Sequence, residues 1–264
     1  MELKYCQIDT FTDKLFGGNP AKVVQLEIWL EDELLQNIAK ENSVDATAFF
    51  VIDGEDIELR WFTPDLELDL CGHATLATAH VLTEFGFDRK TIEFNTKCGK
   101  LYVHVENDLY VMNLPQRKPV KAELPNFIKD SLNKQPKEVL KSRDYILVYE
   151  KENDVRNIKI DKNIFDKENI DPGGVAITAK GNEVDFVSRF FIPQATIFED
   201  PVTGSLHASL TPYWSETLNK KEMIAFQLSS RQGKLYCTNL KDRVLIAGKA
   251  KTYSEGVIKL ATTM

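Results

Sequence analysis

The sequence lacks several features that would assign it quickly to a class. Its four cysteines form no C-x-x-C pair, so a structural zinc site is not expected. No apolar run approaches the roughly 18 residues that a membrane-spanning helix needs. The formal net charge is -7, which lacks the basic excess expected of a partner of nucleic acid or anionic membranes. The first residues carry no basic segment before a long apolar core, so no signal peptide is expected. These absences predict a cytoplasmic protein with reduced thiols.

The bulk composition is that of a folded protein of ordinary type. Of the 264 residues, 43% are hydrophobic and 28% are charged, as in soluble globular proteins. The length is sufficient for one large domain or for two smaller ones. An acidic protein can still bind a small anion, because a local site can be positive.

Most of the chain has the patterns of short strands. Residues 30–42 are an exception, because their leucines and Ile38 follow the spacing of an amphipathic helix. The segments 46–53 and 57–64 are separated by a short Gly-containing turn and predict a hairpin. Further strands are expected at 4–12, 21–26, 66–70, 91–96, 100–107, 109–115, 144–150, 155–160, 173–180 and 184–193, and the segment after 224 reads as strands and turns.

Two helices are expected to be buried. Residues 73–82 are small and apolar on all sides, and residues 204–218 are small and largely apolar. A glycine marks the start of each, in "LCGHATLATA" and "VTGSLHASL". The two similar starts lie about 130 residues apart, too far for a solenoid, and predict two similar domains. Residues 114–140 carry four prolines and many charges, so they are the expected linker, with a short helix inside.

The two helix starts are the first candidates for chemistry. Free N–H groups and the helix dipole at such ends favour a bound carboxylate. Asp200 and His73 lie at these starts, where Asp is also a common cap and His is more often structural. Cys71 precedes Gly72, so its thiol is either an activated base or a small buried apolar group. Its counterpart in the second half is Thr203, which cannot act as such a base.

Cofactor and metal signatures are missing. His73 and His80 are seven residues apart, which is the wrong spacing for two metal ligands on one helical turn. No phosphate-binding loop, nucleophile elbow or dinucleotide glycine pattern is found. We therefore expect neither a metal nor an organic cofactor.

Four stretches of the chain resemble the phenazine-biosynthesis isomerase family, the PhzF-like proteins. They are "IDTFTDKLFGGNPAKVV", "LRWFTPDLELDLCGHATLATAHVL", "VDFVSRFFIP" and "EDPVTGSLHASL", and the resemblance covers nearly the whole length. It implies the α+β fold of diaminopimelate epimerase: two similar domains, each a curved, mostly antiparallel sheet around a central helix, with the active-site cleft between them. The implied domains are 1–115 and 116–254, with 255–264 returning to the first domain as a strand. A homodimer is also implied.

The resemblance also implies an activity. Such proteins move a proton on a small anionic carboxylic acid without a cofactor, using a glutamate, a histidine and an aspartate. The histidine falls on His73 and the aspartate on Asp200. The positions that bind the substrate fall on Asn19, Gly72, Gly204 and Ser205.

The sequence departs from the family at the glutamate. The family pattern N-x-S-E-T-A-F places the glutamate at Ala46 and its preceding serine at Asp45. Because side chains alternate along a strand, Asp45 is expected to point away from the cleft unless a bulge or turn redirects it.

Three hypotheses follow from this departure. Asp45 is an adapted base of an isomerase that works with His73 and Asp200. Alternatively, Cys71 is the base of an epimerase or dehydratase, by analogy with cysteine-dependent relatives of the same fold. As a third possibility, the protein binds small acids without turning them over, because the glutamate is replaced by Ala46.

Overall fold

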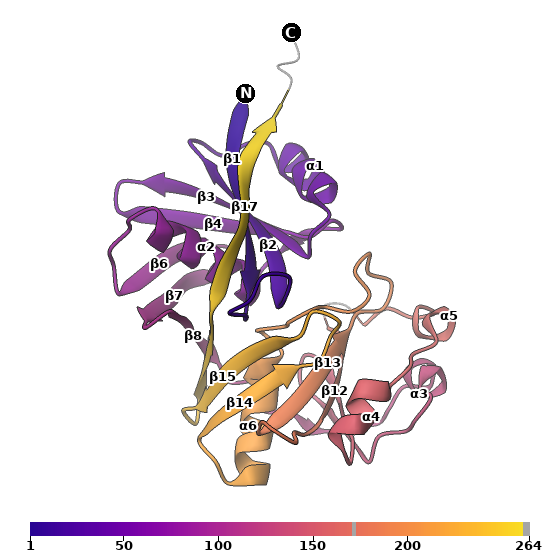
Figure 1. Ribbon diagram of the computed structural model, residues 1–264. Coiled ribbons are helices and arrows are strands. Elements are labelled where there is room, and N and C mark those ends of the chain that lie inside the picture. The colour runs from indigo at the N-terminus through magenta and orange to yellow at the C-terminus, as the bar shows by residue number, and fades with distance from the viewer. Residues whose placement is uncertain (171–172, 261–264) are drawn as a thin grey trace. The chain divides into compact units, whose positions relative to one another are not determined.

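The computed structural model describes residues 1–170 and 173–260, and its elements are mostly strands (Figure 1). The chain divides into two compact units. Unit 1 comprises Met1–Asn113 and the C-terminal segment from Ala247, and unit 2 comprises Leu114–Ile246. In the described part of the chain, no helix is both long and apolar enough to cross a membrane. Of the expected returning strand at 255–264, residues 261–264 lie outside the described residues.

Unit 1 is built on a sheet that mixes antiparallel and parallel pairs. β1 pairs antiparallel with β2 and with β17, the last strand of the chain (yellow in Figure 1). β2 and β3 are parallel, β3 and β4 form the expected antiparallel hairpin, and β4 and β6 are parallel. β7 and β8 complete an antiparallel meander. The strands are β1 (Glu2–Thr10), β2 (Asn19–Leu26), β3 (Ala46–Asp53), β4 (Asp56–Phe62), β5 (Glu67–Leu68), β6 (Thr91–Thr96), β7 (Gly99–Glu106), β8 (Leu109–Pro115) and β17 (Ala250–Lys259).

Helix α2 (Gly72–Glu84) is the central helix of unit 1. Every residue from Gly72 to Leu82 is buried, and the helix contacts β1, β2, β3, β7 and β17. Its buried threonine hydroxyls donate to carbonyls one turn earlier, which satisfies them inside the apolar core; Thr75 bonds the carbonyl of Cys71 at 2.6 Å. The expectation of a helix buried on all sides is therefore confirmed.

Helix α1 (Asp32–Asn42) packs only one face against unit 1. Its buried residues Leu35 and Ile38 join a cluster with Val24, Phe49 and other side chains of β2 and β3. The helix ends at Ser43, whose φ of 52° is left-handed. This residue reverses the chain just before β3 begins.

Unit 2 repeats the same kind of sheet. β10 and β11 are antiparallel, β11 and β12 parallel, β12 and β13 antiparallel, β13 and β14 parallel, and β14 and β15 antiparallel. The strands are β9 (Val120–Lys121), β10 (Glu138–Lys141), β11 (Tyr145–Val148), β12 (Val175–Lys180), β13 (Phe186–Phe191), β14 (Glu222–Gln227), β15 (Gly233–Asn239) and β16 (Arg243–Gly248). The helices are α3 (Asn126–Ser131), α4 (Glu152–Asn157), α5 (Lys162–Phe165) and α6 (His207–Leu218).

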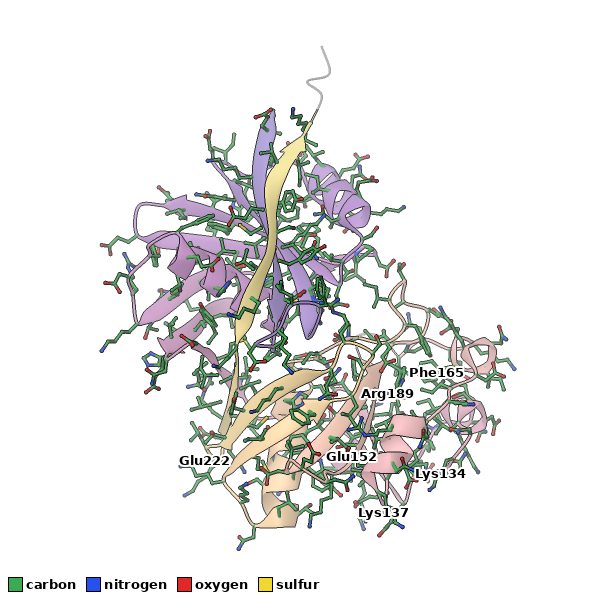
Figure 2. The ribbon with its side chains drawn as sticks, viewed as in Figure 1. Lys134, Lys137, Glu152, Phe165, Arg189 and Glu222 are labelled. Atoms are coloured by element: carbon green, nitrogen blue, oxygen red, sulfur yellow. The ribbon has the colours of Figure 1, made fainter. Side chains whose placement is uncertain are left out.

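One predicted strand is wrong. Residues 155–160 were expected to be extended, but the chain forms α4 up to Asn157 and makes only an isolated bridge at Ile160. Glu152, labelled in Figure 2, pairs with Arg156 one turn later, and Val155 and Ile158 are buried at helical spacing. The alternation of apolar and polar residues at 158–160 is too short to override these helical contacts.

The two units share one order of elements. Two antiparallel strands come first (β1 and β2, or β10 and β11) and are followed by helix. The next strand (β3 or β12) is parallel to the second of these and antiparallel to the strand after it (β4 or β13). The central helix (α2 or α6) follows, and then a strand (β6 or β14) that is parallel to β4 or β13. α2 and α6 occupy the same place in this order. The repeat that the two glycine-marked helices predicted therefore extends to the strands.

Candidate active site

Asp45 lies in the bend between α1 and β3, outside the strand. β3 begins one residue later, at Ala46. The alternation of a strand therefore does not determine where the Asp45 side chain points, and the expectation that it points away does not apply. The bend leaves the carboxylate 15% exposed.

The Asp45 carboxylate meets two other predicted site residues. Asn19 Nδ2 donates to Asp45 Oδ2 at 3.2 Å, and His73 Nε2 lies 3.3 Å from the same oxygen. Asn19 is the first residue of β2, which runs parallel to β3 with Ala21 opposite Ala46. Parallel strands begin at the same edge of a sheet, and α2 begins there too, so the three side chains converge.

The backbone around Asn19 has little freedom. Gly18 has a φ of +62°, and a Cβ at this position would lie 1.9 Å from the Thr10 carbonyl oxygen. Thr10 Oγ1 also donates to the Asn19 carbonyl at 2.9 Å. Only glycine fits at position 18, so the "GGNP" turn is what holds Asn19 toward Asp45.

Burial changes the acidity of Asp45. Removal from water raises the pKa of this carboxyl from 3.8 to about 6, while the hydrogen bond from Asn19 opposes the rise. A carboxylate that titrates near neutral pH can both accept and return a proton. Because part of the side chain is still exposed, the group is accessible to a ligand.

His73 also lies next to the Cys71 thiol. Cys71 Sγ is 3.4 Å from His73 Nδ1, so the ring stands between a thiol and a carboxylate. The tautomer of His73 decides which of its two ring nitrogens carries the proton, and therefore whether the ring can donate to the thiol or to the carboxylate. Burial raises the pKa of the thiols of Cys6 and Cys237 to about 11 and about 12. His80 lies elsewhere, with Nδ1 2.9 Å from the Tyr110 hydroxyl.

In unit 2, Asp200 holds the turn that precedes α6. Its carboxylate accepts from the Thr203 hydroxyl at 2.6 Å and from the Val202 N–H at 3.2 Å. Gln227 of β14 is fully buried, donates to the Asp200 carbonyl at 2.8 Å and accepts from the Thr203 N–H at 2.9 Å. Sequence reasoning missed Gln227, because no motif surrounds it and only the fold brings β14 to this turn.

The two helix starts are alike but not identical. α2 begins at Gly72, whereas Gly204 and Ser205 lie in a tight turn before α6, so the prediction that Gly204 opens the helix is wrong. His207 Nδ1 is 2.9 Å from the Thr203 carbonyl, which matches the bond from Thr75 to Cys71. Burial lowers the pKa of His207 to about 4, so this imidazole is neutral and holds the turn.

The predicted site residues thus form two groups. In unit 1 the start of α2 brings together Asn19, Asp45, Cys71, Gly72 and His73. In unit 2 the turn before α6 contains Asp200, Gly204 and Ser205. Within the described ranges, no set of three or more His, Cys, Asp or Glu side chains is placed to hold a metal ion.

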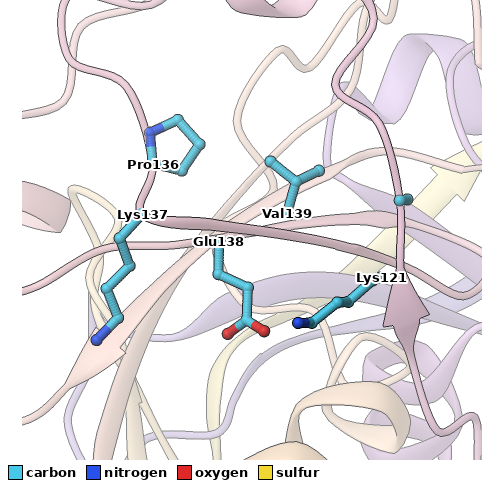
Figure 3. Close-up of a pocket in the computed structure, with 6 residues that line it drawn as sticks. Lys121, Pro136, Lys137, Glu138 and Val139 are labelled. Atoms are coloured by element: carbon cyan, nitrogen blue, oxygen red, sulfur yellow. The ribbon is translucent and has the colours of Figure 1, made fainter.

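A separate hollow of about 520 Å³ lies beside β10 in unit 2 (Figure 3). Its Glu138 accepts from the Tyr213 hydroxyl at 2.9 Å, and Lys137 is 3.5 Å from Glu150. These two charged groups therefore already have partners in the fold. None of the predicted site residues lines this hollow.

Comparison with known proteins gives full-length similarities. Residues 8–256 match the family model described as phenazine biosynthesis-like protein (PhzC-PhzF). An uncharacterized isomerase of Pseudomonas aeruginosa is 43% identical over 98% of this chain and 100% of its own. A phenazine biosynthesis-like domain-containing protein of Homo sapiens is 36% identical over 98% of this chain and 99% of its own.

Solved structures agree with these similarities. The crystal structure of a PhzF-family phenazine biosynthesis protein of Enterococcus faecalis has a TM-score of 0.92 and 41% identity, and the match covers 98% of this chain and 100% of that one. A hydroxyproline epimerase of Agrobacterium vitis has a TM-score of 0.64 at 7% identity, covering 99% and 94% of the two chains. The second likeness shows a shared mixed α/β fold alone.

Proposed function

The chain belongs to the PhzC/PhzF family of phenazine biosynthesis-like proteins, and from this premise we propose that it is a cofactor-independent isomerase that moves a proton on a small carboxylic acid. Full-length relatives at 43% identity are named isomerases, which gives the reaction class. The observation that carries the proposal is the Asp45 carboxylate, 3.3 Å from His73 Nε2 and with a pKa raised to about 6. Small cyclic acids are the first substrates to test.

The proposed reaction needs only a proton carrier. The Asp45 carboxylate takes a proton from one carbon of the unsaturated acid. The electron pair of the broken C–H bond is delocalised over the double bonds of that acid. Asp45 then returns the proton to a different carbon, so the product has the same atoms and oxidation state as the substrate. Asn19 and His73 hold the carboxylate during both transfers. Asp200, Gly204 and Ser205 are assigned to substrate binding and assistance by the family resemblance.

A second candidate rests on the contact between Cys71 and His73. A thiol 3.4 Å from an imidazole nitrogen can become a thiolate base, as an epimerase or dehydratase would require. The third candidate, a protein that binds acids without converting them, rests on the replacement of the family glutamate by Ala46. The position of Asp45 beside His73 favours the isomerase over both. The homodimer, the cytoplasmic location and a cleft between two domains stay predictions.

Solvent-deuterium incorporation tests the proposal. The protein is incubated in D₂O with a panel of small cyclic unsaturated acids, and ¹H NMR follows the loss of carbon-bound protons. We expect exchange into at least one acid, at the two carbons between which the proton moves. Absence of exchange into every acid that measurably binds would identify a binding protein instead. Exchange that survives Asp45→Asn but is lost in Cys71→Ala would identify the thiol as the base.

A further inference from the structure

A cationic side chain reaches the turn before α6. Arg143 lies in the turn between β10 and β11, and its Nη2 donates to Ser205 Oγ at 3.3 Å. The same guanidinium forms a two-pronged pair with Asp144, with distances of 3.0 Å from Nε to Oδ1 and 2.9 Å from Nη2 to Oδ2. The side chain is 25% exposed, so it is oriented by the fold and still accessible.

Arg143 occupies the place in unit 2 that Asn19 occupies in unit 1. Asn19 lies two residues before Ala21, which opens the parallel register of β2 with β3. Arg143 lies two residues before Tyr145, which opens the parallel register of β11 with β12. Asn19 donates to Asp45, which lies beside His73, the residue after Gly72. Arg143 contacts Ser205, the residue after Gly204. The repeat therefore gives each of the two helix starts a polar side chain at the same position.

The fold holds this turn firmly against α6. Asp144 is fully buried and accepts from the Gly174 N–H at 3.0 Å in addition to Arg143. Ser142 Oγ lies 2.8 Å from Ser209 Oγ, in the first turn of α6. The guanidinium is therefore preorganised, which lowers the entropic cost of binding a ligand there.

The local charge leaves a place for an anion. Arg117 donates its backbone N–H to the Ala208 carbonyl at 3.0 Å, and burial together with the charge of Arg143 lowers its pKa. A guanidinium nonetheless stays charged at working pH. Arg117 Nη1 has no access to solvent and no hydrogen-bond partner among the residues that the structure describes. Two guanidinium groups face one carboxylate, Asp144, so the cluster has a net positive charge beside a helix start.

We propose that Arg143, together with Ser205, binds the carboxylate of a small organic acid at the turn before α6, and that Arg117 supplies the second positive charge that selects acids over neutral analogues. Arg143 donates to Ser205 Oγ, which leaves the Ser205 hydroxyl proton free to bond the carboxylate. A hydrogen bond between charged groups is worth about a 10- to 100-fold difference in affinity.

The test uses benzoate and benzamide, which have the same shape and differ in charge. Removing Arg143 alone would leave Asp144 buried and unpaired, so the variant combines Arg143→Gln with Asp144→Asn. The matched control combines Arg156→Gln with Glu152→Gln on α4. Glu152 is likewise buried, pairs with an arginine and accepts one backbone N–H, from Asn182 at 2.7 Å. Dissociation constants come from NMR titration of the full-length chain.

We expect the wild type and the control to bind benzoate about 10-fold or more tightly than benzamide. The Arg143 variant is expected to lose this preference by weakening benzoate alone. Unchanged benzoate affinity, an equal loss for both ligands, or no benzoate binding by the wild type would each overturn the proposal. Because benzoate binding is measured without turnover, failure of deuterium exchange alone rejects the isomerase and leaves the role of Arg143 standing.

Discussion

Replacing Asp45 by asparagine is expected to slow solvent-deuterium exchange into a bound acid by about 10²–10⁴-fold, the usual contribution of a general base. The amide has the same shape and still accepts the hydrogen bond from Asn19, but it cannot take up a proton. Exchange rates from ¹H NMR measure the effect. Benzoate affinity should stay within about twofold of the wild-type value, since the change is confined to proton transfer.

A second carboxylate provides the control for this loss. Glu67 in unit 1 has a similar exposure, with 19% of its side chain accessible, and pairs with Arg60 rather than with a site residue. Glu67→Gln should therefore exchange deuterium at nearly the wild-type rate. If Asp45→Asn also exchanges within about threefold of wild type, a rate ratio too small for a lost general base, Asp45 is not the proton carrier.

The same Asp45→Asn variant is expected to be more stable than the wild type at neutral pH. Burial raises the pKa of Asp45 to about 6, above the ordinary value for an unfolded chain, so the folded state binds more protons between about pH 4 and pH 6. The free energy of unfolding of the wild type therefore falls as the pH rises through this window. At pH 7.5 the ionised carboxylate costs about 3 kcal/mol, which asparagine does not.

Urea unfolding at several pH values checks this expectation. The variant should exceed the wild type by about 2–3 kcal/mol at pH 7.5, and the two should converge near pH 4. A variant that is less stable at pH 7.5, or a stability difference that is the same at pH 4, would show that burial does not destabilise the ionised Asp45 carboxylate in the folded state. The gain in stability with a loss of activity is the trade-off expected of a catalytic group.

Much of the fold could be predicted from local patterns. The small apolar residues around the whole of 73–82 indicated a buried helix, and α2 is buried from Gly72 to Leu82. The hairpin of β3 and β4 also followed from two alternating segments and a short turn. The strand predicted at 155–160 was wrong, because the helical contacts of this segment, including the pair of Glu152 and Arg156, involve residues upstream of the apparent alternation.

The site was less predictable, because single-residue differences decide it. Whether Asp45 lies inside β3 or one residue before it determines which way the carboxylate points, and element boundaries are the least certain part of any pattern. Arg143 carried a usable signal, since it stands just before an expected strand as Asn19 does. Its contact with Ser205 depends on the register of β11 with β12, which the sequence does not reveal.

The pH dependence of deuterium exchange tests most directly the claim that Asp45 carries the proton. The profile of kcat/KM reports the pKa of the base in the free enzyme. Because the base must be ionised, exchange by the wild type should rise with pH and level off above an apparent pKa near 6. In Asp45→Asn this rise should be absent. A step above about pH 8, the range of a cysteine thiol, that persists in Asp45→Asn and disappears in Cys71→Ala would contradict the account.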